Sequence, residues 1–443
     1  MEGSGYNKRR QISFHELVLH RLCLRNHYVT ERRENLDKSS GKKRLQLAVL
    51  LGSLGILGPF TIDTYLPSFP TIVDEFNTTA SLVQISLTSC LLGLGLGQLV
   101  IGPLSDVKGR RKPLLFFLGL YILASLACSF SPNIYFLIGC RFVQGFAASG
   151  GIVLSRAIVR DLYSGKELTK FFTLMVLVGN LGPIIAPIAG GVILAFNDWN
   201  WVFIALACIG MILLFTVSFK LKETLPAEKR VPSNLPYVMS NFGTLFKNKE
   251  FMGYALTQGF ITAGIFAYVS GIPFVYQNVY GVTPQEFSLL FGVNGLALII
   301  GSQLVGRLTD TISEGTFLKI GLVIANASGL WLLIALSLKA PLIGVAIPVF
   351  FFLSSISMIG TTSFTLAIQS QGHMAGSASA LLGVLPFVMG SLSAPLVGIG
   401  GANTGVPMAA VIFGASILAF LCYFIMVRKT KAQETLQMVN RKA

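Results

Sequence analysis

The chain has 443 residues, of which 53% are hydrophobic and only 12% are charged, and its formal net charge is +15. Its mean hydropathy is +0.69. Because soluble domains carry about a quarter charged residues, this composition excludes an ordinary soluble protein and indicates a membrane protein. The positive charge is spread over many loops and is not gathered into one surface, which argues against nucleic acid as a partner.

Twelve stretches of mostly apolar residues follow one another along the chain. Each holds roughly 20 residues and is long enough to cross a bilayer core of about 30 Å as an α-helix. Gly and Pro within several of them are common in helices that pack against other spanning helices. We therefore predict an all-α membrane protein with twelve transmembrane helices, at 45–66, 82–102, 113–130, 134–155, 170–196, 201–219, 251–277, 287–306, 316–338, 341–369, 376–399 and 405–427.

The segment before the first span, residues 1–44, holds eleven basic and five acidic residues. It is interpreted as a cytoplasmic tail, either a disordered extension or one with a short amphipathic helix at 12–24. Its apolar run begins too late for a signal peptide. Apart from Arg141 and Lys339, all Lys and Arg lie in the tails, in the loops of one side or at the span ends next to those loops, so we expect both termini in the cytoplasm.

The first span contains a carboxylate, Asp63, in the sequence TIDTYLP. Asp63 is the one acidic residue inside the predicted spans, and Arg141 is the one basic residue away from the span ends. A charge at the centre of a spanning helix costs roughly 2.5–3.5 kcal/mol, so such residues usually serve a function. Gly52, Gly55 and Pro59 precede the acid at helical spacing. Because small residues permit close packing, we expect this face of the helix to point into the bundle.

Both charges also have a structural interpretation. Pro67 and Pro70 indicate that the first span ends soon after Asp63, which would make it a solvated acid at a helix end. Arg141 shares a small, polar face with Gln144 and could be bonded to backbone carbonyls. The functional hypothesis is that Asp63 exchanges a proton for substrate, while Arg141 positions the acid or the substrate.

The loop after the second span, GPLSDVKGRRK at 102–112, combines glycine with charge. Its charge alone would mark it only as cytoplasmic. Its glycines permit a tight turn, and its carboxylate can accept from the neighbouring arginines or face a helix N-terminus. We interpret it as a cytoplasmic gate that latches one half of the protein against the other. Its residues are Gly102, Asp106, Gly109, Arg110 and Arg111, with Asp310 in the matching loop of the second half.

The chain divides into two related halves. The hydrophilic segment 220–250 separates six spans from six, and the Gly and Asp pattern of residues 97–106 is echoed at 301–310. Two repeated halves with a site between them near the midplane are common in secondary transporters. We predict two pseudo-symmetric six-helix bundles, at 45–219 and 251–427, joined by a cytoplasmic linker at 220–250 and followed by a cytoplasmic tail at 428–443.

Three motifs carry a family resemblance. The loop at 102–112 resembles the signature of the major facilitator superfamily, with Val107 where a basic residue is usual. In the fourth span, residues 137–148 resemble the arginine motif of its drug:proton antiporter branch. The fifth span resembles the antiporter motif of that branch, through Gly182, Pro183, Pro187, Gly190 and Gly191, with Ala186 where Gly is commoner. These residues are also suited to helix bending and close packing between the halves.

The stretches IDTYLPSFP, KETLP and AGSASALLG narrow this to a resemblance with the bicyclomycin-resistance (Bcr/CflA) subfamily of multidrug efflux transporters, over about residues 45–427. The resemblance implies a proton-driven antiporter of the bacterial inner membrane that exports small amphipathic drugs or metabolites by alternating access. We expect a monomer, with proton coupling through Asp63 and Arg141. Candidate residues for a substrate cavity with apolar walls and a few polar groups are Phe60, Tyr65, Gln144, Asn180, Tyr268, Asn294 and Gln369.

Alternatives remain open at this point. An uptake symporter of the same fold would share the span count, linker and gate loop, and a channel or flippase would belong to a different class. No phosphate-binding loop, catalytic motif or metal-ligand spacing is present in the sequence, so we expect protons and small molecules as partners, membrane lipid as the surroundings, and no enzyme activity, cofactor or metal.

Overall fold

The computed structural model describes residues 41–230, 242–371 and 374–428. Residues 1–49 and 50–443 form separate compact units, and the packing reported below is that of the second unit. The predicted amphipathic helix at 12–24, the linker residues 231–241 and the tail residues 429–443 lie outside the described residues.

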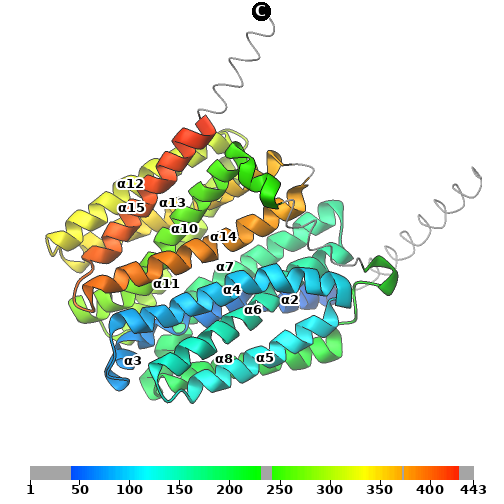
Figure 1. The fold of residues 1–443 in the computed structure, drawn as a ribbon, viewed down its shortest axis with the longest axis horizontal. Helices are drawn as coiled ribbons and strands as arrows, with labels where there is room; N and C mark the ends of the chain where they lie inside the picture. Colours follow the sequence, from blue (N-terminus) through cyan, green and yellow to red (C-terminus); the bar gives the residue numbers. More distant parts are fainter. Residues whose placement is uncertain (1–40, 231–241, 372–373, 429–443) are drawn as a thin grey trace, which may run out of the picture. The chain divides into compact units, whose positions relative to one another are not determined.

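The described residues are almost entirely helical, as the apolar stretches predict (Figure 1). The long helices of the N-terminal half are α2 (Gly41–Asp63), α4 (Ala80–Lys108), α5 (Arg111–Ser129), α6 (Ile134–Leu162), α7 (Gly165–Phe196) and α8 (Asn200–Lys220). Those of the C-terminal half are α10 (Lys249–Phe274), α11 (Pro284–Leu308), α12 (Glu314–Ser337), α13 (Leu342–Gln369), α14 (Ala375–Val397) and α15 (Val406–Cys422). Short elements between them are η1 (Leu66–Ser68), α3 (Phe69–Glu75), η2 (Ala227–Lys229), η3 (Val275–Val279), η5 (Gly398–Gly400) and η6 (Tyr423–Arg428).

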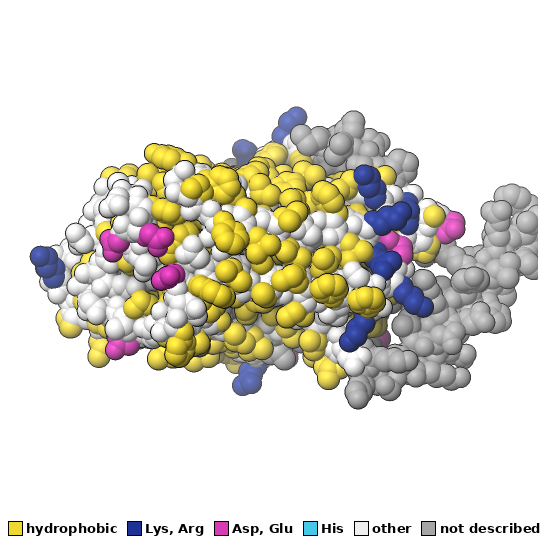
Figure 2. All heavy atoms as spheres, turned by 90° about the horizontal axis from the view of Figure 1, so that it is seen from below, with side chains coloured by type: hydrophobic (Ala, Val, Ile, Leu, Met, Phe, Trp, Pro, Cys, Tyr) yellow, Lys and Arg dark blue, Asp and Glu magenta, His cyan; other side chains and the backbone are white. Residues whose placement is uncertain are grey.

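Eleven helices among the described residues are long and apolar enough to cross a membrane. The remaining predicted span, 170–196, falls on α7, whose described apolar run is the shorter Leu181–Phe196. Several helices run past the predicted spans. For example, α6 continues to Leu162 instead of ending at residue 155. On the face drawn in Figure 2, hydrophobic side chains form a broad band, with most of the visible Lys and Arg beyond one edge and several Asp and Glu beyond the other.

The helices pack in two groups. In the N-terminal half α4 and α5 pack on α6, and α5 also packs on α8; in the C-terminal half α10 packs on α13, α14 and α15, and α12 packs on α13 and α15. The most extensive contacts between the groups are those of α4 with α14 and of α7 with α11. In Figure 1 these four helices lie between the other members of the two groups. The predicted fold of two six-helix bundles is confirmed.

Hydrogen bonds join the two halves at one end of the bundle. We call the end that carries α3 the α3 end, and the opposite end, where α4 meets the loop at 107–112, the motif end. Among the described residues, four hydrogen bonds between the halves lie at the α3 end, with distances of 2.8–3.3 Å. They run from Ser81 Oγ to Gly398 O, from Gln84 Nε2 to Ser270 O, from Gln277 Nε2 to Pro67 O and from Gln285 Nε2 to Gly191 O.

Candidate functional site

Asp63 is the last residue of α2, and its side chain is buried, with only 7% of the residue exposed. The chain then turns through η1 and α3 and remains inside the protein, with Tyr65, Leu66 and Phe69 fully buried. Helix α2 ends before Pro67, as the prolines indicate, but the candidate membrane span continues through η1 and α3 to Glu75. Because the helix end is covered, burial argues against a solvated acid at this position.

Asp63 lines a cavity of about 240 Å³ between the two halves. The walls come from α2, α6 and α7 on one side and from α10, α11, α13 and α14 on the other. Among the described residues that line it, Asp63 is the one charged side chain, and Thr262, Tyr268 and Asn294 are the other polar ones. The Asp63 carboxylate has no recorded hydrogen bond or ion pair within the described part of the chain. An unpaired carboxyl thus faces a largely apolar chamber.

Hydrogen bonds among buried polar groups hold the end of α2 next to this carboxyl. Arg141 Nη1 donates to the backbone carbonyl of Thr61 at 2.9 Å, and the Thr61 hydroxyl is 2.9 Å from the Tyr121 hydroxyl. The last carbonyls of a helix lack partners within the helix, and a cation there also interacts favourably with the helix dipole. Arg141 therefore stabilises the helix end two residues before Asp63.

Arg141 itself is completely buried. Its Nη1 also donates to Gln144 Oε1 at 2.7 Å, and its guanidinium carbon lies 4.7 Å from the centre of the Tyr65 ring. Its Nε and Nη2 have no hydrogen-bond partner among the described residues, and no ion pair between Arg141 and a described carboxylate is present. In this conformation Arg141 contacts the end of α2 through a backbone carbonyl, which agrees with the structural interpretation of this residue.

The glycines of the fifth predicted span, in α7, pack against both halves. A Cβ at Gly190 would lie 2.2 Å from the carbonyl oxygen of Thr64, the residue after Asp63. A Cβ at Gly191 would lie 2.3 Å from Ser288 Oγ in α11. Helix α7 is thus held between the end of α2 and the C-terminal half, and only glycine permits both approaches.

The remaining cavity candidates divide into two groups. Tyr268 and Asn294 line the cavity, and Asn294 Nδ2 donates to the Tyr268 hydroxyl at 3.0 Å. Phe60, Tyr65, Gln144 and Gln369 are not among its lining residues. Tyr65 and Gln144 contact Arg141 instead, and Gln369 is exposed at the motif end of α13. The side chain of Asn180 lies outside the described residues.

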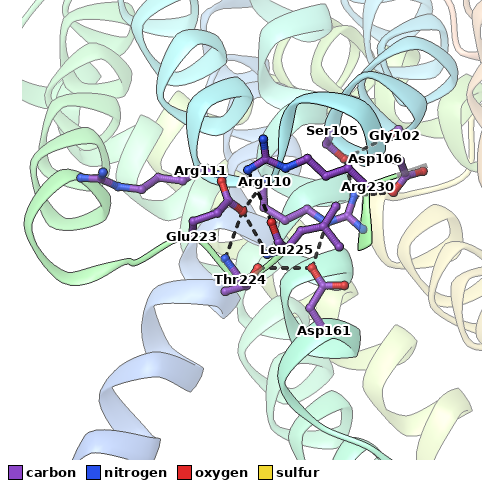
Figure 3. Close-up of polar contacts among 10 residues, drawn as sticks. All are labelled: Gly102, Ser105, Asp106, Arg110, Arg111, Asp161, Glu223, Thr224, Leu225 and Arg230. Carbon is purple, nitrogen blue, oxygen red and sulfur yellow. Dashed lines mark hydrogen bonds and ion pairs between the residues drawn. The ribbon is translucent and has the colours of Figure 1, made fainter. Parts of the chain in front are cut away.

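The gate loop forms a polar cluster at the motif end (Figure 3). Arg110 is mostly buried, and its guanidinium pairs with Asp106 at 2.5 Å and with Asp161 at 2.9 Å. Burial alone would lower the pKa of Arg110, but the hydrogen bonds to the two carboxylates outweigh it and raise the pKa above its ordinary value. The predicted contact between Asp106 and an arginine is present. Because Arg110 also pairs with Asp161, its two ion pairs connect α4 to the end of α6.

Glu223, in the KETLP stretch after α8, completes this cluster and was not predicted as a site residue. Its carboxylate accepts from the backbone N–H groups of Arg110 at 2.8 Å and Arg111 at 3.2 Å, at the start of α5. It also accepts from the backbone N–H groups of Thr224 and Leu225. An anion at a helix N-terminus satisfies unpaired donors and the helix dipole. The KETLP stretch was the available signal, because it places an acid directly after a span.

Three expectations about the gate need correction. The described contacts of the cluster lie within the N-terminal half and the segment after α8, so they do not latch the two halves together. Asp310 is exposed and has no ion pair among the described residues, because its loop lacks the arginines that follow Asp106. A Cβ at Gly102 would make only an ordinary contact, whereas Gly109 has a φ of +86° and touches Glu223.

Replacing Glu223 by Gln should make the N-terminal half slightly less stable at neutral pH, with Tm lower by about 1–2 °C. Partial burial works to raise the pKa of Glu223, but the four backbone N–H groups outweigh it and hold the pKa below its usual value. The stabilisation is therefore present above the ordinary glutamate pKa of about 4.3 and is lost as the pH falls through the lowered pKa of the folded state.

Thermal unfolding of the purified protein in detergent at several pH values checks this, with the exposed Glu228→Gln as the matched control. The difference in Tm between the parent and Glu223→Gln should disappear as the pH falls toward 3. If Tm does not differ at neutral pH, or if Glu228→Gln lowers it equally, Glu223 does not stabilise the N-terminus of α5.

Among the described residues, eleven helices that could span a membrane and the shorter apolar run of α7 form two groups around a central cavity with a buried carboxyl. This arrangement defines a multi-pass membrane transporter. The model of the Major Facilitator Superfamily matches residues 51–395, and the chain belongs to this family. The resemblance drawn from the motifs is confirmed. Because the family consists of transporters, the chain is classed as a transporter and not as an enzyme.

Individual proteins agree with this assignment. The chain is 50% identical to the uncharacterized MFS-type transporter YdgK of Bacillus subtilis, over 90% of this chain and 100% of that protein. It is 33% identical to the bicyclomycin resistance protein homolog of Haemophilus influenzae, over 86% of this chain and 95% of that protein. Its fold matches a bacterial homolog of the human lysosomal transporter Spinster, solved in an inward-facing conformation, with a TM-score of 0.70, 14% identity and coverage of 88% and 99% of the two chains.

Proposed function

We propose that this protein is a proton-driven efflux antiporter that exports small amphipathic drugs or metabolites across the bacterial inner membrane, with both termini in the cytoplasm. The observation that carries the proposal is the unpaired Asp63 carboxyl in the apolar cavity between the halves. The similarity to a bicyclomycin resistance protein homolog supports drugs as the substrate class.

The coupling follows from the chemistry of the cavity. Apolar walls penalise a charged carboxylate, and a cationic or polar drug placed beside it offsets that penalty. Drug and proton therefore compete for Asp63, while Arg141 keeps the end of α2 in place through the Thr61 carbonyl. If the proton is taken up from the periplasm and released to the cytoplasm, its inward flow drives the drug outward.

The contacts between the halves support alternating access. In the proposed orientation the α3 end is periplasmic, and it is closed by the four hydrogen bonds between the halves. A typical hydrogen bond contributes about 0.5–1.5 kcal/mol net, so opening this end costs a few kcal/mol. Binding of a drug or a proton can supply free energy of that size.

Drug accumulation in cells tests the direction of transport. Cells that express the protein should accumulate less of a drug such as bicyclomycin than cells without it, and a protonophore should remove the difference. Higher accumulation in the expressing cells would indicate an uptake symporter and would refute export. A difference that survives the protonophore would refute proton drive.

A further inference from the structure

A second pocket, of about 230 Å³, opens on the lipid-facing side of the C-terminal half. Its walls come from η3, α11 and α13. Val293, Ile343 and Ile347 line it and are exposed on helices that are apolar and long enough to span the membrane. Their position in the N-terminal halves of α11 and α13 places the pocket in the half of the membrane toward the α3 end. A molecule dissolved in the bilayer can therefore reach it directly.

The pocket contains a buried tyrosine hydroxyl whose hydrogen bonding is incomplete. Tyr276 lines it and is fully buried, and its hydroxyl makes no well-formed hydrogen bond within the described residues, although the Asn294 side chain lies beside it. The amide of Asn294, which lines the same pocket, donates to the Tyr268 hydroxyl at 3.0 Å. A buried polar group without a partner is unfavourable, so a hydrogen-bond acceptor bound in the pocket would stabilise Tyr276.

Asn294 lines both this pocket and the central cavity that contains Asp63. A single side chain of α11 therefore forms part of the partition between the lipid-facing pocket and the proposed transport chamber.

We propose that the pocket between α11 and α13 is a lateral binding site for a small amphipathic substrate dissolved in the bilayer, with a carbonyl or ether oxygen that accepts from Tyr276, and that Asn294 separates it from the central cavity. This inference rests on the proposed function, because it names a membrane route for the same class of substrate. The apolar walls bind the body of the molecule, and the tyrosine selects for an acceptor.

Photolabelling of the purified protein in phosphatidylcholine vesicles tests the site. The probes are 3-trifluoromethyl-3-phenyldiazirine and its 4-acetyl derivative, which adds a carbonyl acceptor. The acetyl probe should label the segments around Val293 and Ile347 in a saturable manner. Tyr276→Phe should raise the half-saturation concentration of the acetyl probe about three- to tenfold, the effect of one hydrogen bond. It should leave labelling by the diazirine without the acetyl group unchanged.

A filling substitution with a matched control tests the location. Ala346 lines the pocket and is the fifth residue of α13, whereas Ala410 is the fifth residue of α15 and is exposed away from both cavities. Ala346→Phe should reduce saturable labelling at least fivefold, and Ala410→Phe should leave it unchanged. Thermal unfolding of each variant confirms that it is folded, and Tyr276→Phe removes a hydroxyl that makes no well-formed hydrogen bond among the described residues.

The outcomes separate this site from the proposed function. Labelling needs no gradient, so saturable labelling with no drug export would retain the site and refute the efflux proposal. Labelling that rises without saturation would show bulk lipid contact only. Labelling that is unaffected by Ala346→Phe, or equal for the acetyl probe in the parent and Tyr276→Phe, would also overturn the lateral site.

Discussion

Replacing Asp63 by Asn should reduce drug accumulation driven by a pH gradient in inside-out vesicles by about tenfold or more, which is within the usual range of coupling between two ligands. Asn keeps the size and the hydrogen-bonding capacity of the side chain but cannot gain or lose a proton. Since Asp63 is the one charged residue among the described lining of the cavity, no other lining group replaces it. Exchange of labelled for unlabelled neutral drug should persist, because that process needs no proton.

The matched control is Asp74→Asn, which removes an acid that is exposed on α3 and outside the cavity. This variant should transport like the parent. Undiminished gradient-driven accumulation by Asp63→Asn would remove Asp63 from the coupling mechanism. A loss of drug exchange along with accumulation would indicate a binding or folding defect instead, which a thermal unfolding scan distinguishes.

Replacing Gly190 by Ala should abolish transport and lower stability by about 1–3 kcal/mol, the usual cost of overpacking. The new Cβ would lie 2.2 Å from the Thr64 carbonyl oxygen and 3.0 Å from its carbon. These are backbone atoms, so side-chain rotation cannot relieve the contact. Either α7 or the end of α2 must move, and Asp63 moves with the latter.

Gly179→Ala on the same helix is the control, because nothing lies within 4 Å of its Cβ position. It should fold and transport like the parent, since alanine is favoured over glycine in a helix interior by about 0.5–1 kcal/mol. Thermal unfolding and drug transport are measured on both variants. Equal behaviour of Gly190→Ala and Gly179→Ala would show that the close approach to Thr64 is unimportant.

The parts of the fold that could be predicted are those set by local composition. The thickness of the bilayer fixes the length of each apolar run, so the span positions follow from the sequence, although α6 extends beyond its span because a helix can project into water. The inward direction of Asp63 followed from the spacing of Gly52, Gly55 and Pro59, which needs only helix geometry. Its burial and its place in the cavity agree with that expectation.

The parts that could not be predicted depend on distant segments that meet in space. Thr262 and Phe387 line the cavity, yet nothing in their local sequence distinguishes them from other span residues. Tyr65 was a cavity candidate by residue type, but it packs beneath Arg141. Asp310 matches Asp106 in the sequence repeat, and it lacks an ion pair among the described residues because the partner of Asp106, Arg110, has no counterpart in its loop.

Proton release on drug binding tests the central claim most directly. Purified protein in weakly buffered detergent solution is mixed with drug, and a pH indicator reports the protons released per drug bound across a range of pH. Competition at Asp63 predicts release that approaches one proton per drug at its maximum and vanishes in Asp63→Asn. Equal release by the parent and Asp63→Asn would contradict the account.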